Sequence, residues 1–308
     1  MPNNFTWNGR VDPDPQSIRY HQKVQQTEMN NLAKNTTFPH FGLVGFSCDE
    51  GVRRNQGRVG AALAPNEIRT QLASLPYHLS KTEIIDVGNI SCKDENLEEA
   101  QEELGETLAN LYQSGFTPII IGGGHETLYG HYLGVREYIG DESTLGIINI
   151  DAHFDLRKDQ QPSSGTMFRQ ILDNDQNTGY LCLGIQHFGN TKSLFDAAKH
   201  YSCEYIFEEE LEDEQSTKHT IHQFMEKYDY IILTLCMDVL NATAAPGVSA
   251  PSPFGLDPKV VRKLIRHIVG YQNVVSFDLS EVNPKVDEGD KTSKLAAYIL
   301  AEAMYHFK

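Results

Sequence analysis

The feature that most constrains the fold is a regular alternation between short apolar segments and longer amphipathic ones. Eight apolar segments have the length and composition of strands: 41–47, 82–88, 117–123, 145–150, 180–185, 204–208, 230–237 and 273–280. Between many of them apolar residues recur every three or four positions, as helices require, at 97–113, 126–139, 165–172, 258–269 and 293–307. Strands that are apolar throughout and alternate with helices indicate a parallel sheet covered on both faces.

The chain is predicted to form one domain, residues 1–308. It has 40% hydrophobic residues, enough for a large core, and it contains no internal repeat, low-complexity tract or Pro/Ser-rich linker that would mark a boundary. The segment before residue 40 precedes the first predicted strand. We expect it to be an N-terminal arm that includes a helix.

Charge and cysteine content narrow the classes of partner. Acidic residues outnumber basic ones 42 to 26, and the formal net charge of −16 disfavours nucleic acid and anionic membranes as partners. A small-molecule ligand fits better. The five scattered cysteines form no CxxC pair, and the polar N-terminus and the lack of a run of about 18 apolar residues give no leader or membrane span. We therefore expect a cytoplasmic protein, and the sequence leaves open whether it forms a homo-oligomer.

Polar side chains follow four of the predicted strands at the points where the strands end. The segment "GIINIDAHFDLR" places acidic and imidazole side chains at alternate positions, and other strands end in "GGGHE", "LCMD" and "SEVNP". The residues concerned are His125, Asp151, His153, Asp155, Cys236, Asp238 and Glu281. In open parallel sheets the functional site lies outside the carboxyl ends of the strands, and side chains at i, i+2 and i+4 share one side of an extended chain. We expect these side chains to converge on one cavity.

Each of these residues also has an ordinary structural explanation. A "GGGH" segment is most often a turn from a strand to a helix, and Asp or His near a strand end is often a helix cap. However, several ligand-type side chains beside a buried core are unfavourable unless cations neutralise them. The many carboxylates favour hard divalent ions, and mixed His and Asp ligands suit manganese. Six ligands are more than one hydrated ion needs, so we predict two ions that share bridging ligands.

The same segments carry a family resemblance. "GGGHE", "NIDAHFDLR" and "CMDVLNATAAPGVSAP" resemble the three metal motifs of the arginase and ureohydrolase family, and "GVRRNQGRVGAALAPNEIR", "SSGTMFRQIL" and "SEVNPKVDEGDKTSKLAA" resemble its formimidoylglutamase branch. The resemblance implies a three-layer αβα fold with an eight-stranded, mainly parallel sheet and a pair of Mn²⁺ ions. It also implies hydrolysis of N-formimidoyl-L-glutamate to L-glutamate and formamide, a step of histidine degradation.

The resemblance assigns the metal ligands to two overlapping sets. One ion would be held by His125, Asp151, Asp155 and Cys236, and the other by Asp151, His153, Cys236 and Asp238. The family usually has Asp at position 236, and the softer thiolate of Cys236 should hold manganese less securely. Arginases have His at the position of Phe168 and agmatinases have His at the position of Ser164, so both of those activities are disfavoured.

The catalytic roles follow from the chemistry that such a site supports. Asp155, next to the attacking water, is expected to accept its proton and return it to the departing amine. Glu281 is expected to pair with the cationic nitrogen of the substrate. The structural alternative for Glu281 is a buried carboxylate that caps the "EVNP" turn by accepting backbone N–H groups.

The two carboxylates of the substrate require local positive charge and polar contacts. Arg157, two residues after Asp155, is the main candidate because a guanidinium can bind a carboxylate through two hydrogen bonds. Further candidate substrate contacts lie in the motifs that resemble the branch: Asn55, Arg58, Ser164 and Arg169. Arg53 and Arg54 lie in the same motifs. For at least two of these five arginines the alternative is an ordinary surface ion pair.

Two other functions remain open on the sequence alone. Another ureohydrolase, acting on a guanidino acid, agmatine or arginine and releasing urea, would share every metal ligand. A non-catalytic relative would need broken ligands, yet only position 236 departs from the family pattern, and cysteine can still bind a metal.

Overall fold

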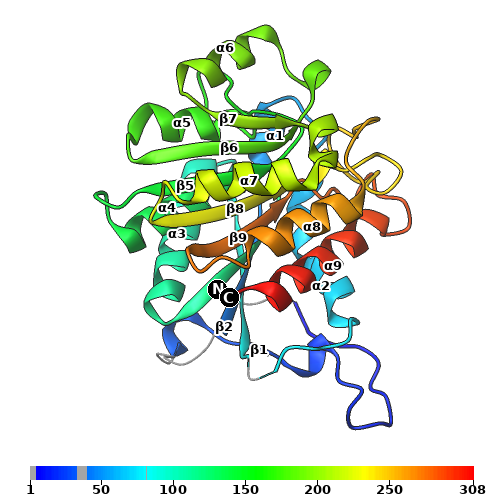
Figure 1. Ribbon diagram of the computed structural model, residues 1–308. Helices are drawn as coiled ribbons and strands as arrows, with labels where there is room; N and C mark the ends of the chain where they lie inside the picture. Colours follow the sequence, from blue (N-terminus) through cyan, green and yellow to red (C-terminus); the bar gives the residue numbers. More distant parts are fainter. Residues whose placement is uncertain (1–4, 33–39, 81) are drawn as a thin grey trace.

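The computed structural model describes residues 5–32, 40–80 and 82–308, and its strands form a single nine-stranded sheet (Figure 1). The strands are β1 (Val24–Gln26), β2 (His40–Ser47), β3 (Ile84–Ser91), β4 (Phe116–Ile121), β5 (Leu145–Ile150), β6 (Thr178–Ile185), β7 (Glu204–Phe207), β8 (Tyr230–Cys236) and β9 (Val274–Ser280). Their order is β1-β3-β2-β4-β9-β8-β5-β6-β7, and every neighbouring pair is parallel. Their carboxyl ends therefore meet at one edge.

Nine α-helices are present in the described part of the chain. They are α1 (Glu50–Arg54), α2 (Ala64–Ala73), α3 (Leu97–Gln113), α4 (Thr127–Ile139), α5 (Met167–Asn174), α6 (Lys192–His200), α7 (Glu214–Met225), α8 (Pro258–Ile268) and α9 (Lys291–His306). Short 3-10 helices complete the connections: η1 (Tyr20–Gln22), η2 (Met29–Asn31), η3 (Ala61–Leu63), η4 (His187–Gly189), η5 (Glu208–Glu212) and η6 (Met237–Val239). None of the described helices is long and apolar enough to cross a membrane.

The helices cover both faces of the sheet and give the molecule three layers (Figure 1). One apolar core contains buried residues of α2, α7, α8 and α9 packed on the sheet, and a second contains buried residues of α3, α4, α5 and α6. All six residues of the central strand β5 are buried, as expected for a strand with helices on both sides. The predicted three-layer fold is confirmed.

Local sequence explains why two of the helices begin near their predicted first residues. Asn96 begins α3 because its side chain accepts a hydrogen bond from the backbone N–H of Glu99, and Asp257 accepts from the backbone N–H of Lys259 at the start of α8. Buried side chains along α3 recur every three or four residues, which fastens one face of the helix to the core.

The structure adds one strand to the eight that the sequence predicts. β1 pairs with β3 at an edge of the sheet and comes from the segment before residue 40. It is only three residues long and two of these are exposed, so the sequence contains no apolar pattern that would predict it. Within residues 5–32 the rest of the predicted N-terminal arm contains η1 and η2 and no α-helix. Residues 1–4 and 33–39 of that arm lie outside the described residues.

The topology brings the predicted site residues together. β4, β9, β8 and β5 are consecutive in the sheet, and each is followed by one of the polar segments described above. Ile150 of β5 lies beside Leu235 of β8, and Cys236 of β8 lies beside Ser280 of β9. Side chains from four distant segments therefore meet at the centre of the sheet edge.

Candidate metal centre and active-site cavity

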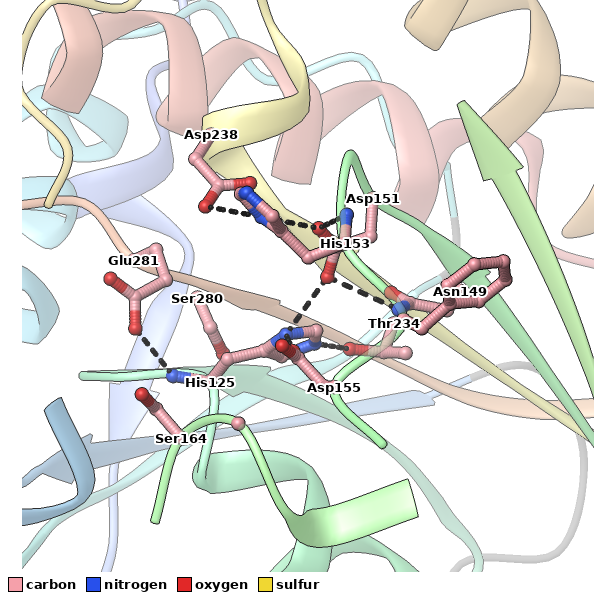
Figure 2. Close-up of polar contacts among 12 residues, drawn as sticks. His125, Asn149, Asp151, His153, Asp155, Ser164, Thr234, Asp238, Ser280 and Glu281 are labelled. Atoms are coloured by element: carbon pink, nitrogen blue, oxygen red, sulfur yellow. Dashed lines mark hydrogen bonds and ion pairs between the residues drawn. The ribbon is translucent and has the colours of Figure 1, made fainter. Parts of the chain in front are cut away.

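The centre of the site is Asp151, which lies between two histidines (Figure 2). Its Oδ2 is 3.1 Å from Nδ1 of His125, and its Oδ1 is 3.5 Å from Nδ1 of His153. Nδ1 of His125 also lies 2.9 Å from Oδ2 of Asp155, and Nδ1 of His153 lies 3.3 Å from Oδ2 of Asp238. Each histidine thus faces two carboxylates, and Asp151 is shared between them.

These side chains form two overlapping groups with the geometry of metal ligands. Ligand atoms of His125, Asp151 and Cys236 lie within 4.8 Å of one another, and so do ligand atoms of Asp151, His153 and Asp238. In addition, Oδ1 of Asp238 is buried without a hydrogen-bond partner among the described residues. A shared carboxylate, a thiol and an unpaired buried oxygen fit a pair of divalent cations.

The segment 151–155 was predicted to be extended, and this geometry holds only at its start. β5 ends at Ile150, and Asp155 has a φ of 50°, in the left-handed region that non-glycine residues rarely adopt. Glu281, directly after β9, has a φ of 71°. The side chains of Asp151, His153 and Asp155 still converge. A sharp turn of the backbone at Asp155 contributes to this convergence, so the alternation of side chains along an extended chain does not account for it fully. Such strained residues concentrate at functional sites.

The titratable groups respond strongly to burial and to one another. Burial alone would lower the pKa of His125, but Asp151 and Asp155 raise it well above its ordinary value. Burial would likewise lower the pKa of His153, but Asp238 and Asp151 raise it well above its ordinary value. Burial, together with the charge of Asp151, raises the pKa of Asp155 to about 6. The cluster of carboxylates therefore favours bound positive charge, of the kind that metal ions would supply.

A cavity of about 380 Å³ opens above these residues. Most predicted site residues line it: Asn55, Arg58, His125, His153, Asp155, Arg157, Ser164, Cys236, Asp238 and Glu281. Asp151 is fully buried beneath it. Arg169 is not among the lining residues.

Glu281 has features of both roles considered for it. Its Oε1 accepts a hydrogen bond of 2.9 Å from the backbone N–H of His125, and the side chain also lines the cavity. Burial, then the charges of Glu126 and Asp238, raise its pKa well above the ordinary value. Glu281 therefore both fixes the His125 backbone and presents a carboxyl group to the cavity.

Among the polar residues at the cavity mouth, Arg58 and Asn55 are held by long-range contacts, whereas the contact of Arg157 is local. Nε and Nη2 of Arg58 donate to the backbone oxygens of Ser249 and Val248, at 2.9 and 2.6 Å. Nδ2 of Asn55 donates to Oγ of Ser164 at 3.1 Å. Arg157 is 54% exposed, and its Nε donates to Oδ2 of Asp159 at 3.2 Å.

Three other arginines of the motifs are engaged away from the cavity. Arg53 and Arg54 both pair with Glu50, and each also pairs with a carboxylate near the start of α3. Nε of Arg169 lies 3.6 Å from Asp173, and its guanidinium lies over the ring of Tyr201. The contacts of Arg53 and Arg169 match the surface ion-pair alternative, whereas Arg54 is largely buried and pairs with the buried Glu50.

Several residues that hold the predicted ligands in place were not predicted from the sequence. Nε2 of His125 lies 3.0 Å from Oγ1 of Thr234, and Nδ2 of Asn149 donates to Oδ2 of Asp151 at 3.1 Å. Glu126, whose pKa burial raises to about 7, accepts a hydrogen bond from the backbone N–H of Gly51 in α1. Thr234 and Asn149 each precede a predicted ligand by two positions, which was an available signal.

Comparison with known proteins identifies the family. The model of the arginase family matches residues 39–306, which span nearly all of the described chain. The chain belongs to the arginase family. Its predicted family membership is confirmed.

Similar proteins within this family share its full length. This arginase-family chain is 54% identical to a formimidoylglutamase of Geobacillus sp. (strain WCH70), covering 100% of the chain and 96% of that protein. It is 40% identical to a formimidoylglutamase of Staphylococcus haemolyticus (strain JCSC1435), over 98% of the chain and 96% of that protein.

Among solved structures, the fold is similar to formimidoylglutamase from Bacillus subtilis, with a TM-score of 0.84, 23% identity and coverage of 97% of this chain and 94% of that one. It is also similar to Trypanosoma cruzi formiminoglutamase with Mn²⁺, with a TM-score of 0.79, 23% identity and coverage of 90% and 97%. These structures share the arginase-family fold.

Proposed function

We propose that this chain hydrolyses N-formimidoyl-L-glutamate to L-glutamate and formamide, as a step of histidine degradation. The observation that carries the proposal is identity of 54% to a formimidoylglutamase along the whole chain. Staphylococcal proteins of the same name are similar over nearly the same length, which extends this support beyond one genus.

The proposed cofactor is a pair of Mn²⁺ ions. His125, Asp151, Asp155 and Cys236 would hold one, and Asp151, His153, Cys236 and Asp238 the other. The two ligand groups of the structure support most of this assignment, because each contains Asp151 and because the ligand atoms within each group lie within 4.8 Å of one another. Among the described residues, neither group includes Asp155, and Cys236 belongs to the group of His125 alone. When bound, such a pair lowers the pKa of water enough to supply a nucleophile near neutral pH.

The reaction requires a proton to move from the attacking water to the leaving nitrogen. Asp155 lines the cavity, and its Oδ2 is 2.9 Å from Nδ1 of His125. We assign it as the group that accepts the proton of the water as the new C–O bond forms. It then returns that proton to the glutamate nitrogen as the C–N bond breaks. Glu281 would pair with the remaining cationic nitrogen of the formimidoyl group.

The glutamate part of the substrate must lie toward the cavity mouth. Arg157 is the proposed carboxylate partner, since its guanidinium is half-exposed at the cavity and tied to only one carboxylate in the described structure. Asn55, Arg58 and Ser164 supply polar surface beside it. Arg169 is the weakest of the predicted contacts, because it lines a neighbouring hollow instead.

The test is to compare four substrates with the same manganese-loaded protein. Formimidoylglutamate, arginine, agmatine and guanidinobutyrate are supplied side by side, and formamide and urea are measured. We expect turnover of formimidoylglutamate with release of formamide. Preferential release of urea from a guanidino substrate would instead identify another ureohydrolase, which would use the same metal ligands.

A cytoplasmic location is part of the proposal. All five cysteines are free thiols in the structure, as is usual in a reducing compartment.

A further inference from the structure

A continuous chain of buried polar side chains leads away from the metal centre beneath the cavity. Starting from His125, it runs through Thr234, Asp278, His131 and Ser276 to Tyr112. Its successive contacts are 3.0, 2.8, 2.7, 2.5 and 2.6 Å long. All six residues are buried, so their polar groups form hydrogen bonds with one another and not with solvent at the surface. The first contact, between His125 and Thr234, is drawn in Figure 2.

The hydrogen-bond directions can be assigned from the far end of this chain. Tyr112 donates its O–H to Ser276, so the proton of Ser276 is available for Nε2 of His131. His131 then carries its proton on Nδ1 and donates it to Oδ2 of Asp278. This assignment leaves every donor on that side with an acceptor.

The hydrogen-bond directions between Asp278 and His125 can be assigned in the same way. Thr234 donates its single O–H to Oδ1 of Asp278. A hydroxyl has only one proton, so Thr234 must accept the hydrogen bond that joins it to Nε2 of His125. Nε2 of His125 therefore carries a proton. Both arms of the chain donate toward the carboxylate of Asp278.

This direction determines which nitrogen of His125 is available to a cation. With the proton on Nε2, Nδ1 is the nitrogen that faces Asp151 and Asp155. We propose that Thr234 and Asp278 are positioning residues that hold His125 in the tautomer and orientation needed for metal binding through Nδ1. The inference rests on the proposed function insofar as His125 is taken as a manganese ligand. Such partners of ligating histidines raise ligand basicity and fix ring orientation.

A second buried threonine provides a matched control. Thr178, at the first position of β6, donates its hydroxyl to Oδ2 of Asp175 at 2.6 Å, as Thr234 does to Asp278. Thr178 begins its strand, whereas Thr234 lies near the carboxyl end of β8, the end that carries the cavity. Replacing either threonine by Val removes a buried hydroxyl that donates to a carboxylate. Only Thr234 also contacts a predicted metal ligand, His125.

The experiment measures Mn²⁺ affinity by titration calorimetry, with thermal unfolding followed on the same samples. Thr234→Val should weaken Mn²⁺ binding about 10- to 100-fold, the range for loss of a partner of a ligating histidine. Thr234→Ser, which keeps the hydroxyl, should stay within about threefold of the original protein. Thr178→Val should lower the unfolding temperature and leave Mn²⁺ affinity unchanged.

The outcomes separate this inference from the proposed function. Equal Mn²⁺ affinities for Thr234→Val and the original protein, or equal losses in Thr234→Val and Thr178→Val, would overturn the positioning role. No Mn²⁺ binding by the original protein would overturn the proposed function instead. If Thr234→Val does not fold, Asp278→Asn replaces it. There a loss of about 10-fold or more in affinity supports the role, and unchanged affinity overturns it.

Discussion

The floor and the rim of the cavity lie at different distances along the chain from the strands of the sheet. The cavity floor is defined as His125, Asp151, His153, Cys236 and Asp238, which lie at the end of a central strand or a few residues after it. The cavity rim is defined as Asn55, Arg58, Arg157 and Ser164, which lie in the connection after α1 and in the later part of the connection from β5 to α5. Asp151 of the floor is fully buried, whereas Arg157 of the rim is 54% exposed.

This difference indicates where chemistry and specificity reside. Strand ends in a packed sheet hold side chains rigidly, which suits metal ligands whose spacing must be fixed. Loops can change without disturbing the sheet, which suits recognition of different substrates. We therefore expect floor variants to lose metal and rim variants to lose substrate discrimination.

The largest effect is expected for Asp151, the only described residue in both ligand groups. Asp151→Asn should release most of the manganese and lower kcat/KM at least about 10³-fold, because the metal supplies several kcal/mol of transition-state stabilisation. Metal content and kinetics are measured together. Asp173→Asn, which alters a half-exposed carboxylate outside the cavity, is the control. A metal-free but active Asp151→Asn variant would show that the floor does not carry the chemistry.

A rim variant should behave in the opposite way. Arg157→Ala should keep its manganese and lower kcat/KM for formimidoylglutamate about 30-fold, or about 2 kcal/mol. That is the low end of the range for losing one partner of a charge pair, because solvent screens a half-exposed guanidinium. Arg157→Lys should recover part of this loss, since a point charge cannot form two parallel hydrogen bonds.

Arg169→Ala is the matched control for Arg157, because Arg169 lies outside the cavity lining. Its kcat/KM should stay within about threefold of the original value, as for other exposed ion pairs. If Arg169→Ala is impaired and Arg157→Ala is not, the carboxylate partner lies in the neighbouring hollow and the rim must be redefined.

Most of the floor could be predicted from the sequence, whereas the contacts of the rim could not. His125, Asp151 and Cys236 follow directly from strands that are recognisable by their apolar content, and parallel topology brings such strand ends together. By contrast, Arg58 contacts Val248, a residue 190 positions away, and Asn55 contacts Ser164, 109 positions away. Contacts of that kind depend on how loops settle on the folded sheet, and no local pattern encodes them.

The turn at Asp155 is an intermediate case. Its residue type and position identified it, but its left-handed backbone conformation is imposed by the surrounding structure and contradicts the preference of a non-glycine residue. The simple alternation that suggested convergence of the three side chains was therefore incomplete. The position of Arg157 two residues after Asp155 nevertheless predicts its place at the cavity mouth, and the structure has it among the residues that line the cavity.

A further variant of the cavity floor tests its unusual ligand, Cys236. Cys236→Asp restores the residue that the family usually has, and it should bind Mn²⁺ about 10-fold more tightly because a hard ion prefers oxygen to sulfur. Burial, followed by the charges of Asp151 and Asp238, raises the pKa of the Cys236 thiol, so a thiolate ligand must be generated by the ion itself. Calorimetric titration at several pH values checks this. Affinity of the original protein should depend more steeply on pH, and parallel pH profiles would contradict thiolate ligation.

The smallest effect is expected for Asp175. Its replacement tests whether any carboxylate that is held by hydrogen bonds and ion pairs affects manganese binding as the residues of the cavity floor do. Asp175 is not among the residues that line the cavity, and Arg136, Tyr132 and Thr178 contact it. Although burial tends to raise the pKa of Asp175, hydrogen bonds from Thr178 and other groups, with the charge of Arg136, leave it below its ordinary value. The charged form is therefore favoured in the folded state, and its stabilising effect is present above the ordinary pKa of about 3.9 and lost as pH falls below it.

Asp175→Asn should accordingly lower the free energy of unfolding by about 1 kcal/mol at pH 7, which is about 2 °C in unfolding temperature for a chain of this size. The difference from the original protein should shrink as the pH falls from 5 toward 3, because the original protein then loses the same charge. Manganese content should not change at pH 7. If Asp175→Asn lost manganese as Asp151→Asn is expected to, the distinction between the floor and other buried polar clusters would fail, since a general loosening of the fold would then be enough to empty the metal centre.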